Sequence, residues 1–156
     1  MKAMVVYDSL YGNTAQIAQA IADGLRSAST DALEIELCKI GDARPEQLAG
    51  LDLLAIGSPT HGALPTEAVQ ELLARIGPPT HAGARVATFD TRLAWPFLER
   101  WGGFAAPKMA DSLEERGWVL AAPPEGFIVK GLKKGPLKQG ELDRATAWAR
   151  ELAAKP

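Results

Sequence analysis

Two patterns of apolar residues alternate along this chain. Short, nearly continuous apolar runs are typical of strands buried on both faces of a sheet, and apolar residues that recur every three to four positions are typical of helices with one buried face. The runs predict strands at residues 2–7, 33–40, 51–57 and 84–89, and a broken last strand at 118–121 and 126–129. The second pattern predicts helices at residues 14–27, 65–76, 107–116 and 140–154.

This regular alternation of strands and helices predicts an α/β fold. Because crossovers between parallel strands are right-handed, the helices should cover both faces and form a three-layer doubly wound sandwich around a five-stranded parallel sheet. No linker long enough to separate two domains interrupts the pattern, so we expect residues 1–156 to form a single domain. Ligands of such sheets bind beyond the carboxyl ends of the strands, and the loops there are candidates for function.

Proline and glycine set several of the expected boundaries. Pro65 suits the first residue of its helix, where the missing N–H has no partner to lose. Gly117 is expected to end the third helix. Pro123 and Pro124 cannot donate to a sheet and should interrupt the last strand. Residues 90–103 follow neither pattern, and we expect them to be irregular.

The composition narrows the possible functions. With 17 Lys and Arg against 19 Asp and Glu, the net charge of −2 gives no overall attraction for nucleic acid. Cys38 is the only cysteine, so an internal disulfide and a multi-cysteine metal site are excluded, and we expect no metal. No apolar run approaches the ~20 residues of a membrane span and the first residues show no secretion signal, so we expect a cytoplasmic protein without a membrane span.

The loop after the first predicted strand is the strongest candidate for ligand binding. It consists of Ser9, Leu10, Tyr11, Gly12, Asn13 and Thr14. Successive backbone N–H groups and a helix start can bind phosphate, and the polar side chains add donors. The loop has no lysine and no magnesium ligand, which favours a monophosphate over a triphosphate. The competing interpretation is that Asn13 or Thr14 only caps the helix.

This uncharged loop resembles the phosphate loop of the flavodoxin family, in which it holds FMN directly after the first strand. Two further segments resemble the flavin loops of that family, namely Gly57 to Gly62 after the third strand and Thr88 to Arg92 after the fourth. The long insertion that interrupts the last strand of long-chain members is absent. The resemblance therefore implies a short-chain flavodoxin-like protein with sheet order 2-1-3-4-5 and FMN as its cofactor.

The resemblance also implies which residues contact the flavin. In the second loop they are Pro59, Thr60, His61 and Gly62, and in the third loop Thr88, Phe89, Asp90, Thr91 and Arg92. Asp90 is expected near the polar edge of the ring or the ribityl chain. The His61–Gly62 peptide is the candidate for the backbone group that reorients when the flavin takes up a proton, because glycine adopts either orientation at low cost.

The aromatic residues depart from the family pattern. Flavodoxins usually sandwich the ring between two aromatic side chains, but His61 occupies the first of these positions and Trp95 lies one place later than the second. His61 is either a flavin contact or an exposed loop histidine. Trp95 is the candidate for covering one ring face, unless it forms a small satellite core with Phe97 and Trp101.

The lysines after the last strand are a second departure from an acidic family. They are Lys130, Lys133, Lys134 and Lys138. If they lie near the ring edge, they should stabilise the anionic reduced flavin, raise its potential and favour an acidic partner. The competing interpretation is a solvated surface.

Together these features predict an FMN-binding electron-transfer protein that passes electrons between redox partner proteins. One alternative is an FMN-dependent reductase of a small electron acceptor such as a quinone, although His61 is the only visible proton donor for such a reaction. The other alternative is a flavin-free flavodoxin-like module for protein contacts, which a visible absorption spectrum distinguishes. The sequence does not indicate the oligomeric state.

Overall fold

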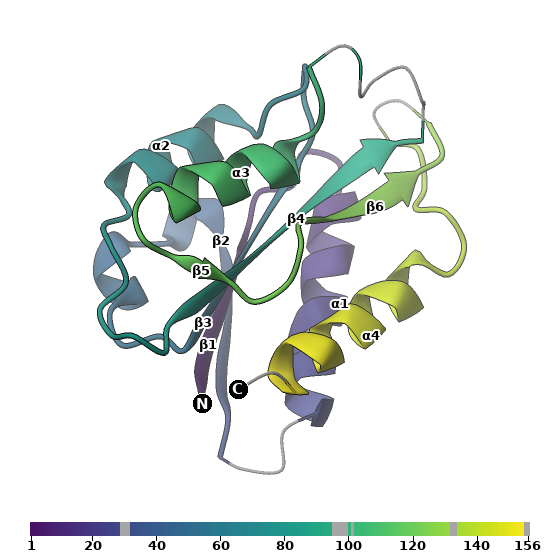
Figure 1. Cartoon of the computed structure of the whole chain (residues 1–156). Helices are drawn as coiled ribbons and strands as arrows, with labels where there is room; N and C mark the ends of the chain where they lie inside the picture. The colour runs from purple at the N-terminus through teal and green to yellow at the C-terminus, as the bar shows by residue number, and fades with distance from the viewer. Residues whose placement is uncertain (29–31, 95–99, 101, 132–133, 155–156) are drawn as a thin grey trace.

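The computed structural model describes residues 1–28, 32–94, 100, 102–131 and 134–154. These residues form a three-layer α/β sandwich with a parallel sheet in the middle (Figure 1). The strands are β1 (Lys2–Tyr7), β2 (Glu34–Lys39), β3 (Leu53–Pro59), β4 (Arg85–Leu93), β5 (Val119–Leu120) and β6 (Glu125–Val129). Their order is β2-β1-β3-β4-β5, with β6 also paired to β4, which confirms the predicted fold class and strand order.

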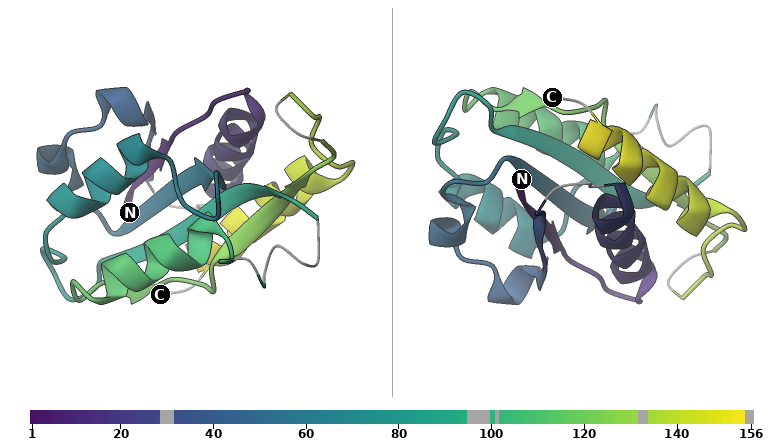
Figure 2. Two further views of the ribbon diagram at one scale, coloured as in Figure 1. Left: turned by 90° about the horizontal axis from the view of Figure 1, so that it is seen from above. Right: turned by 90° about the horizontal axis from the view of Figure 1, so that it is seen from below.

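Helices cover both faces of the sheet (Figure 2). They are α1 (Asn13–Ala28), α2 (Glu67–Arg75), α3 (Ala105–Glu114) and α4 (Glu141–Ala154), and two short 3₁₀ turns, η1 (Ile40–Asp42) and η2 (Pro45–Leu48), precede β3. One apolar core lies between the sheet and the pair α1 and α4, and the other lies between the sheet and the pair α2 and α3. Gly24 of α1 lies so close to Thr146 and Ala149 of α4 that a Cβ there would collide with them.

The last strand is divided, as the proline pair predicted. β5 pairs with the first part of β4, and β6 pairs with its second part from Phe89 to Leu93. β4 is therefore longer than predicted, and the expectation that residues 90–93 are irregular is wrong. Residues 90–92 are polar, which hid a strand whose Asp90 is fully buried.

Two helices begin elsewhere than predicted. α2 starts at Glu67, because the Thr66 side chain accepts the bond from Val69 N–H and so serves as the N-cap. Pro65 therefore precedes the helix. α3 starts at Ala105, and Pro107 lies within its first turn, where proline is tolerated. Gly117 follows α3 with a φ of 90°, as its expected role in ending the helix requires.

Side chains from α4 bind the open edge of β6. Arg144 donates to the carbonyl of Gly126, and Glu141 Oε2 accepts from the N–H of Ile128 at 2.7 Å. The chain then turns back along the same edge, where Lys138 N–H donates to Ile128 O at 2.8 Å. These contacts fix the segment that follows β6 at the carboxyl end of the sheet.

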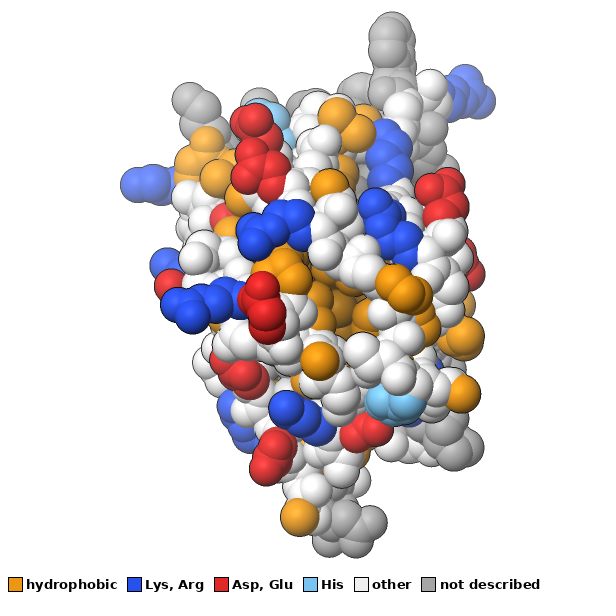
Figure 3. Space-filling model, turned by 90° about the vertical axis from the view of Figure 1, so that its left-hand side faces the viewer, with side chains coloured by type: hydrophobic (Ala, Val, Ile, Leu, Met, Phe, Trp, Pro, Cys, Tyr) orange, Lys and Arg blue, Asp and Glu red, His pale blue; other side chains and the backbone are white. Residues whose placement is uncertain are grey.

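The surface in Figure 3 mixes basic and acidic side chains around a central group of hydrophobic ones. This view of the described residues shows no continuous basic surface. Within the described ranges, no helix is both long and apolar enough to cross a lipid bilayer.

Candidate functional site

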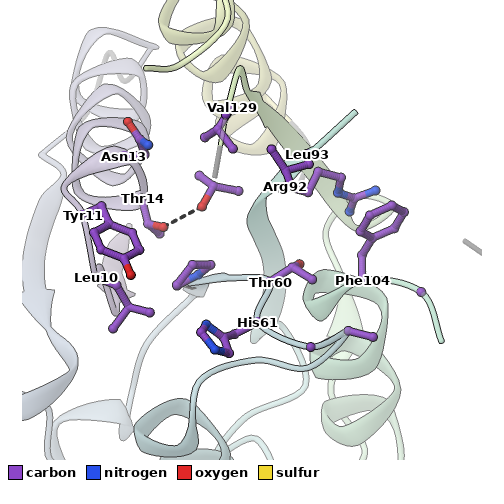
Figure 4. Close-up of a pocket in the computed structure, with 16 residues that line it drawn as sticks. Leu10, Tyr11, Asn13, Thr14, Thr60, His61, Arg92, Leu93, Phe104 and Val129 are labelled. Carbon is purple, nitrogen blue, oxygen red and sulfur yellow. Dashed lines mark hydrogen bonds between the residues drawn. The ribbon is translucent and has the colours of Figure 1, made fainter. Parts of the chain in front are cut away.

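A cavity of about 610 Å³ opens at the carboxyl end of the sheet. The loop after β1, the carboxyl ends of β3, β4 and β6, the turn after β3 and the start of α3 surround it (Figure 4). Its lining residues are Leu10, Tyr11, Asn13, Thr14, Pro59, Thr60, His61, Gly62, Ala63, Thr91, Arg92, Leu93, Gly103, Phe104, Val129 and Gly131. The volume lies within the range of roughly 300–1,000 Å³ that is usual for small-molecule sites.

The loop after β1 presents a set of free N–H groups to one end of this cavity. Ser9 Oγ accepts from the N–H groups of Gly12 and Ala15, at 3.1 and 3.2 Å. Ser9 N–H itself donates to Asp8 Oδ1 at 2.9 Å. Within the described part of the chain, no acceptor binds the other four N–H groups, those of Leu10, Tyr11, Asn13 and Thr14. Unpaired N–H groups at a helix start attract anions, because the helix dipole adds to their own partial charges.

Two side chains of this loop connect it to the neighbouring strands. The hydroxyls of Thr14 and Thr91 form a buried hydrogen bond of 2.8 Å, drawn as a dashed line in Figure 4. Asn13 Nδ2 donates to Gly135 O at 2.6 Å, which joins the start of α1 to the segment after β6. The first loop is therefore held on both sides of the cavity.

The second loop ends in a tight turn from His61 to Leu64. Each of these two residues donates its N–H to the carbonyl of the other, at 2.8 and 3.1 Å. Gly62 and Ala63 between them have φ values of 55° and 66°, and positive φ at both central residues is the signature of a type I′ turn. For alanine this conformation costs roughly 1–2 kcal/mol, so the surroundings must hold it.

The hydrogen bonds of this turn distinguish its peptide groups. The carbonyl of His61 is bonded to Leu64 N–H, so the His61–Gly62 peptide is already held. In the Gly62–Ala63 peptide neither Gly62 O nor Ala63 N–H has a partner among the described residues. The structure therefore favours the Gly62–Ala63 peptide, not the expected His61–Gly62 peptide, as the backbone group that can rotate.

Asp90, which was expected in the third loop and belongs to β4, lies behind the cavity and does not line it. Its carboxylate binds the guanidinium of Arg92 through two contacts of 2.7 Å and accepts from Ala106 N–H at 2.8 Å, which caps α3. Burial raises the pKa of Asp90, while Arg92 and the Ala106 N–H act in the opposite direction. The guanidinium of Arg92 also lies 3.8 Å from the centre of the Phe104 ring, and Figure 4 shows the side chain directed away from the middle of the cavity.

Thr88 and Phe89 are core residues in the structure. The Thr88 hydroxyl donates to Ala106 O at 2.9 Å, and the residue is fully buried. The Phe89 ring packs edge-on against Phe127 and Trp148, with ring centres 6.5 and 6.2 Å apart. It also covers Gly57, where a Cβ would overlap it.

The structure brings together ten of the residues that the sequence singled out. They are Leu10, Tyr11, Asn13, Thr14, Pro59, Thr60, His61, Gly62, Thr91 and Arg92. Ser9, Gly12, Thr88, Phe89 and Asp90 support these residues without lining the cavity. Trp95, with Phe97 and Trp101, and also Lys133, lie outside the described residues.

Sequence reasoning missed six lining residues, namely Ala63, Leu93, Gly103, Phe104, Val129 and Gly131. Val129 ends β6 and Gly131 follows it, and the rule that ligands bind beyond the carboxyl ends of strands already indicated that position. Phe104 carried no such signal. It reaches the cavity only because Asp90, distant in the sequence, holds the start of α3 there.

The segment after β6 carries the lysines. Val129 pairs with Leu137 in an antiparallel bridge and Lys130 N–H donates to Pro136 O, so residues 134–138 lie back along residues 129–131. We call residues 129–131 and 134–138 the lysine hairpin. Lys130, Lys134 and Lys138 are exposed on it. Its bond to Asn13 attaches it to the free N–H groups of the first loop.

Comparison with known proteins agrees with this geometry. A flavodoxin of Aquifex aeolicus is 38% identical over 63 residues, which are 40% of this chain and 33% of that protein. The "Putative diflavin flavoprotein A 4" of Synechocystis sp. is 31% identical over 121 residues, which are 76% of this chain and 19% of that protein. The matched part thus spans a third or less of each curated relative. The structure of a flavodoxin from the domain Archaea superimposes with a TM-score of 0.76 at 23% identity, covering 98% of this chain and 96% of that one.

The model of the flavodoxin family matches residues 5–89. This span is more than half of the chain, and it contains both the first loop with its free N–H groups and the strained second loop. The chain belongs to the flavodoxin family, whose members bind FMN and transfer electrons.

Proposed function

We propose that residues 1–156 form one FMN-binding domain that carries electrons between redox partners. The observation that supports this most directly is the set of four free N–H groups at one end of a cavity with largely apolar walls. A phosphate and a flat aromatic ring system need these two environments side by side.

The cavity residues fit FMN from end to end. The phosphate would lie against the N–H groups from Leu10 to Thr14, with the Asn13 and Thr14 side chains beside it. The ring would lie toward the second loop, where Pro59 and His61 line the cavity. When bound, FMN supplies the redox chemistry, and the protein holds the ring and controls its access to water.

The Gly62–Ala63 peptide is the movable polar group at this ring site. Rotating it changes ψ of Gly62 and φ of Ala63 and converts a type I′ turn into a type II′ turn. The rotation releases Ala63 from its positive φ and leaves Gly62 in a conformation that glycine adopts readily. With FMN bound, the peptide would therefore be able to present the Gly62 carbonyl to the ring edge as a hydrogen-bond acceptor.

The rim of the cavity offers an apolar contact surface for a partner protein. Leu10, Tyr11 and Leu64 are large hydrophobic residues with 49%, 46% and 45% of their surface exposed. Exposed apolar groups clustered beside a binding site are typical of interaction surfaces. A partner that docks here would lie next to the open side of the flavin, which is the arrangement that electron transfer between proteins requires.

The test is to titrate the purified protein with FMN and riboflavin and to compare two matched variants. Thr14→Val removes a hydroxyl at the phosphate position and its bond to Thr91, whereas Thr91→Val removes the same bond but leaves the Thr14 hydroxyl. We expect Thr14→Val to weaken FMN binding about tenfold, because hydrogen bonds to charged groups contribute ~1.5–3 kcal/mol. Riboflavin binding should change little.

Thr91→Val should weaken FMN binding less than Thr14→Val does. Equal affinity of the wild type for FMN and riboflavin would show that the first loop does not hold phosphate. Absence of flavin binding and of visible flavin absorbance would instead support the flavin-free alternative.

A further inference from the structure

The strained turn of the second loop is attached to α3 by a lysine. Lys108 Nζ donates to the carbonyl of Ala63 at 2.5 Å, from a helix that follows 45 positions later in the chain. Ala63 is the residue with φ of 66°, and its carbonyl belongs to the peptide directly after the rotatable one. The lysine therefore binds the turn at the residue that bears the strain.

Two further contacts show that this side of the loop is built around the lysine bond. Ala105 N–H donates to Thr60 Oγ1 at 3.0 Å, so α3 also holds the residue before the turn. Gly102 has a φ of 112°, and a Cβ at this position would lie 3.1 Å from the Ala63 methyl and 4.0 Å from Lys108 Nζ. The backbone of Gly102 therefore packs closely against the Ala63 methyl beside the lysine, and its positive φ would strain any larger residue there.

We propose that Lys108 is a positioning residue that sets the conformation of the His61–Leu64 turn and thereby tunes how this turn meets the flavin. By holding the Ala63 carbonyl, Lys108 restrains the far side of the turn and leaves the Gly62–Ala63 peptide as its movable part. The effect on the flavin rests on the proposed FMN site, whereas the effect on the turn does not.

The first measurement uses the protein without flavin. In Lys108→Met, amide hydrogen exchange at Leu64, whose N–H bonds to His61 O, should be about tenfold faster than in the wild type. Lys108→Arg retains a charged donor and should restore most of the protection. Arg116→Met is the matched control, because it removes a cation that binds Ser112 at the other end of α3. It should leave exchange at Leu64 unchanged.

The second measurement separates positioning from simple electrostatic attraction. FMN affinity and the reduction potential are measured for Lys108→Met, Ala63→Gly and the double variant. We expect Lys108→Met to weaken FMN binding about tenfold and to shift the reduction potential of the bound flavin, since the charge-assisted bond that holds the turn is lost. In the Ala63→Gly background the same change should have at most a third of this effect on affinity, because glycine adopts positive φ without strain.

Equal effects of Lys108→Met in both backgrounds would overturn the proposal, because a charge acting at a distance does not depend on the residue at position 63. Unchanged exchange at Leu64 in the flavin-free Lys108→Met variant would overturn it as well. Faster exchange at Leu64 in a protein that binds no FMN would support the role of Lys108 in the turn and contradict the proposed function.

Discussion

Asp90 joins three parts of the site with one carboxylate. It binds Arg92 on its own strand and the first turn of α3, and Thr60 of the second loop lies beside it. The pair with Arg92 is almost dry, since 17% of the Arg92 side chain and none of Asp90 is exposed. A buried charge pair is strongly destabilised when one partner is removed, because the other charge stays in the interior.

Asp90→Asn should therefore lower the free energy of unfolding by about 3–5 kcal/mol. Urea denaturation measures this, with Asp111→Asn on the exposed side of α3 as the control. The double variant Asp90→Leu, Arg92→Met removes both charges and should recover much of the loss. If Asp90→Asn lowered the free energy of unfolding by less than about 1 kcal/mol, the Arg92 charge would be solvated and the pair would not behave as a buried one.

The position of the lysine hairpin indicates which part of FMN its lysines can affect. The sequence suggested an effect on the flavin ring, but the bond between Asn13 and Gly135 attaches the hairpin to the phosphate end of the site. Exposed charges act weakly, and beyond the screening length of about 8 Å at physiological ionic strength their effect is largely lost. We therefore expect the hairpin to act mainly on the phosphate of FMN.

Changing Lys130, Lys134 and Lys138 to Gln should weaken FMN binding about two- to fivefold at low salt, because each exposed charge contributes only a few tenths of a kcal/mol. Riboflavin binding should be unaffected, and the difference should vanish at high salt. Lys2→Gln, at the amino end of β1, is the control. A large change in reduction potential with unchanged FMN affinity would place the lysines at the ring instead.

At the scale of the whole molecule, stability should depend on pH through Glu141. Its carboxylate binds Arg144 and the N–H of Ile128, and these contacts lower its pKa from 4.5 in spite of burial. A lowered pKa in the folded state gives stability that is fully present above the unfolded value. That stability is lost as the pH falls through the pKa of the folded state.

Glu141→Gln should therefore lower the free energy of unfolding by about 1–3 kcal/mol at pH 7. The difference from the wild type should shrink as the pH falls below about 4, where the wild-type carboxyl becomes protonated. Denaturation series at several pH values measure it, with the exposed Glu151→Gln on the same helix as control. A difference that is the same at pH 7 and pH 3 would assign the loss to packing.

The sequence predicts those parts of the molecule whose signals are local. The run from Lys2 to Tyr7 and the stripe of α1 follow from hydrophobic periodicity, and the first loop follows from its position between them. The second half of β4 was not predictable in this way. Its polar residues are buried because Arg92 neutralises Asp90, and that pairing depends on the tertiary structure.

The residues of the site that depend on tertiary contacts were likewise not predictable from the sequence. Phe104 and Lys108 reach the cavity and the second loop only because α3 is capped by residues from two other segments. A helix whose own N-cap residue makes no side-chain bond gives no sign in the sequence of where it begins. Contacts of this kind become visible only in the folded chain.

The contacts of α4 with β6 also bear on self-association. A strand at the border of a sheet normally offers its main-chain groups to another copy of the chain, and such pairing leads to aggregates. Here Arg144 and Glu141 bind the outward groups of Gly126 and Ile128, and the hairpin covers the positions that follow. β5, the other strand on this border, has only two residues before the proline pair. This side of the sheet is thus closed to strand addition by the same side chains that fix the segment after β6 beside the cavity.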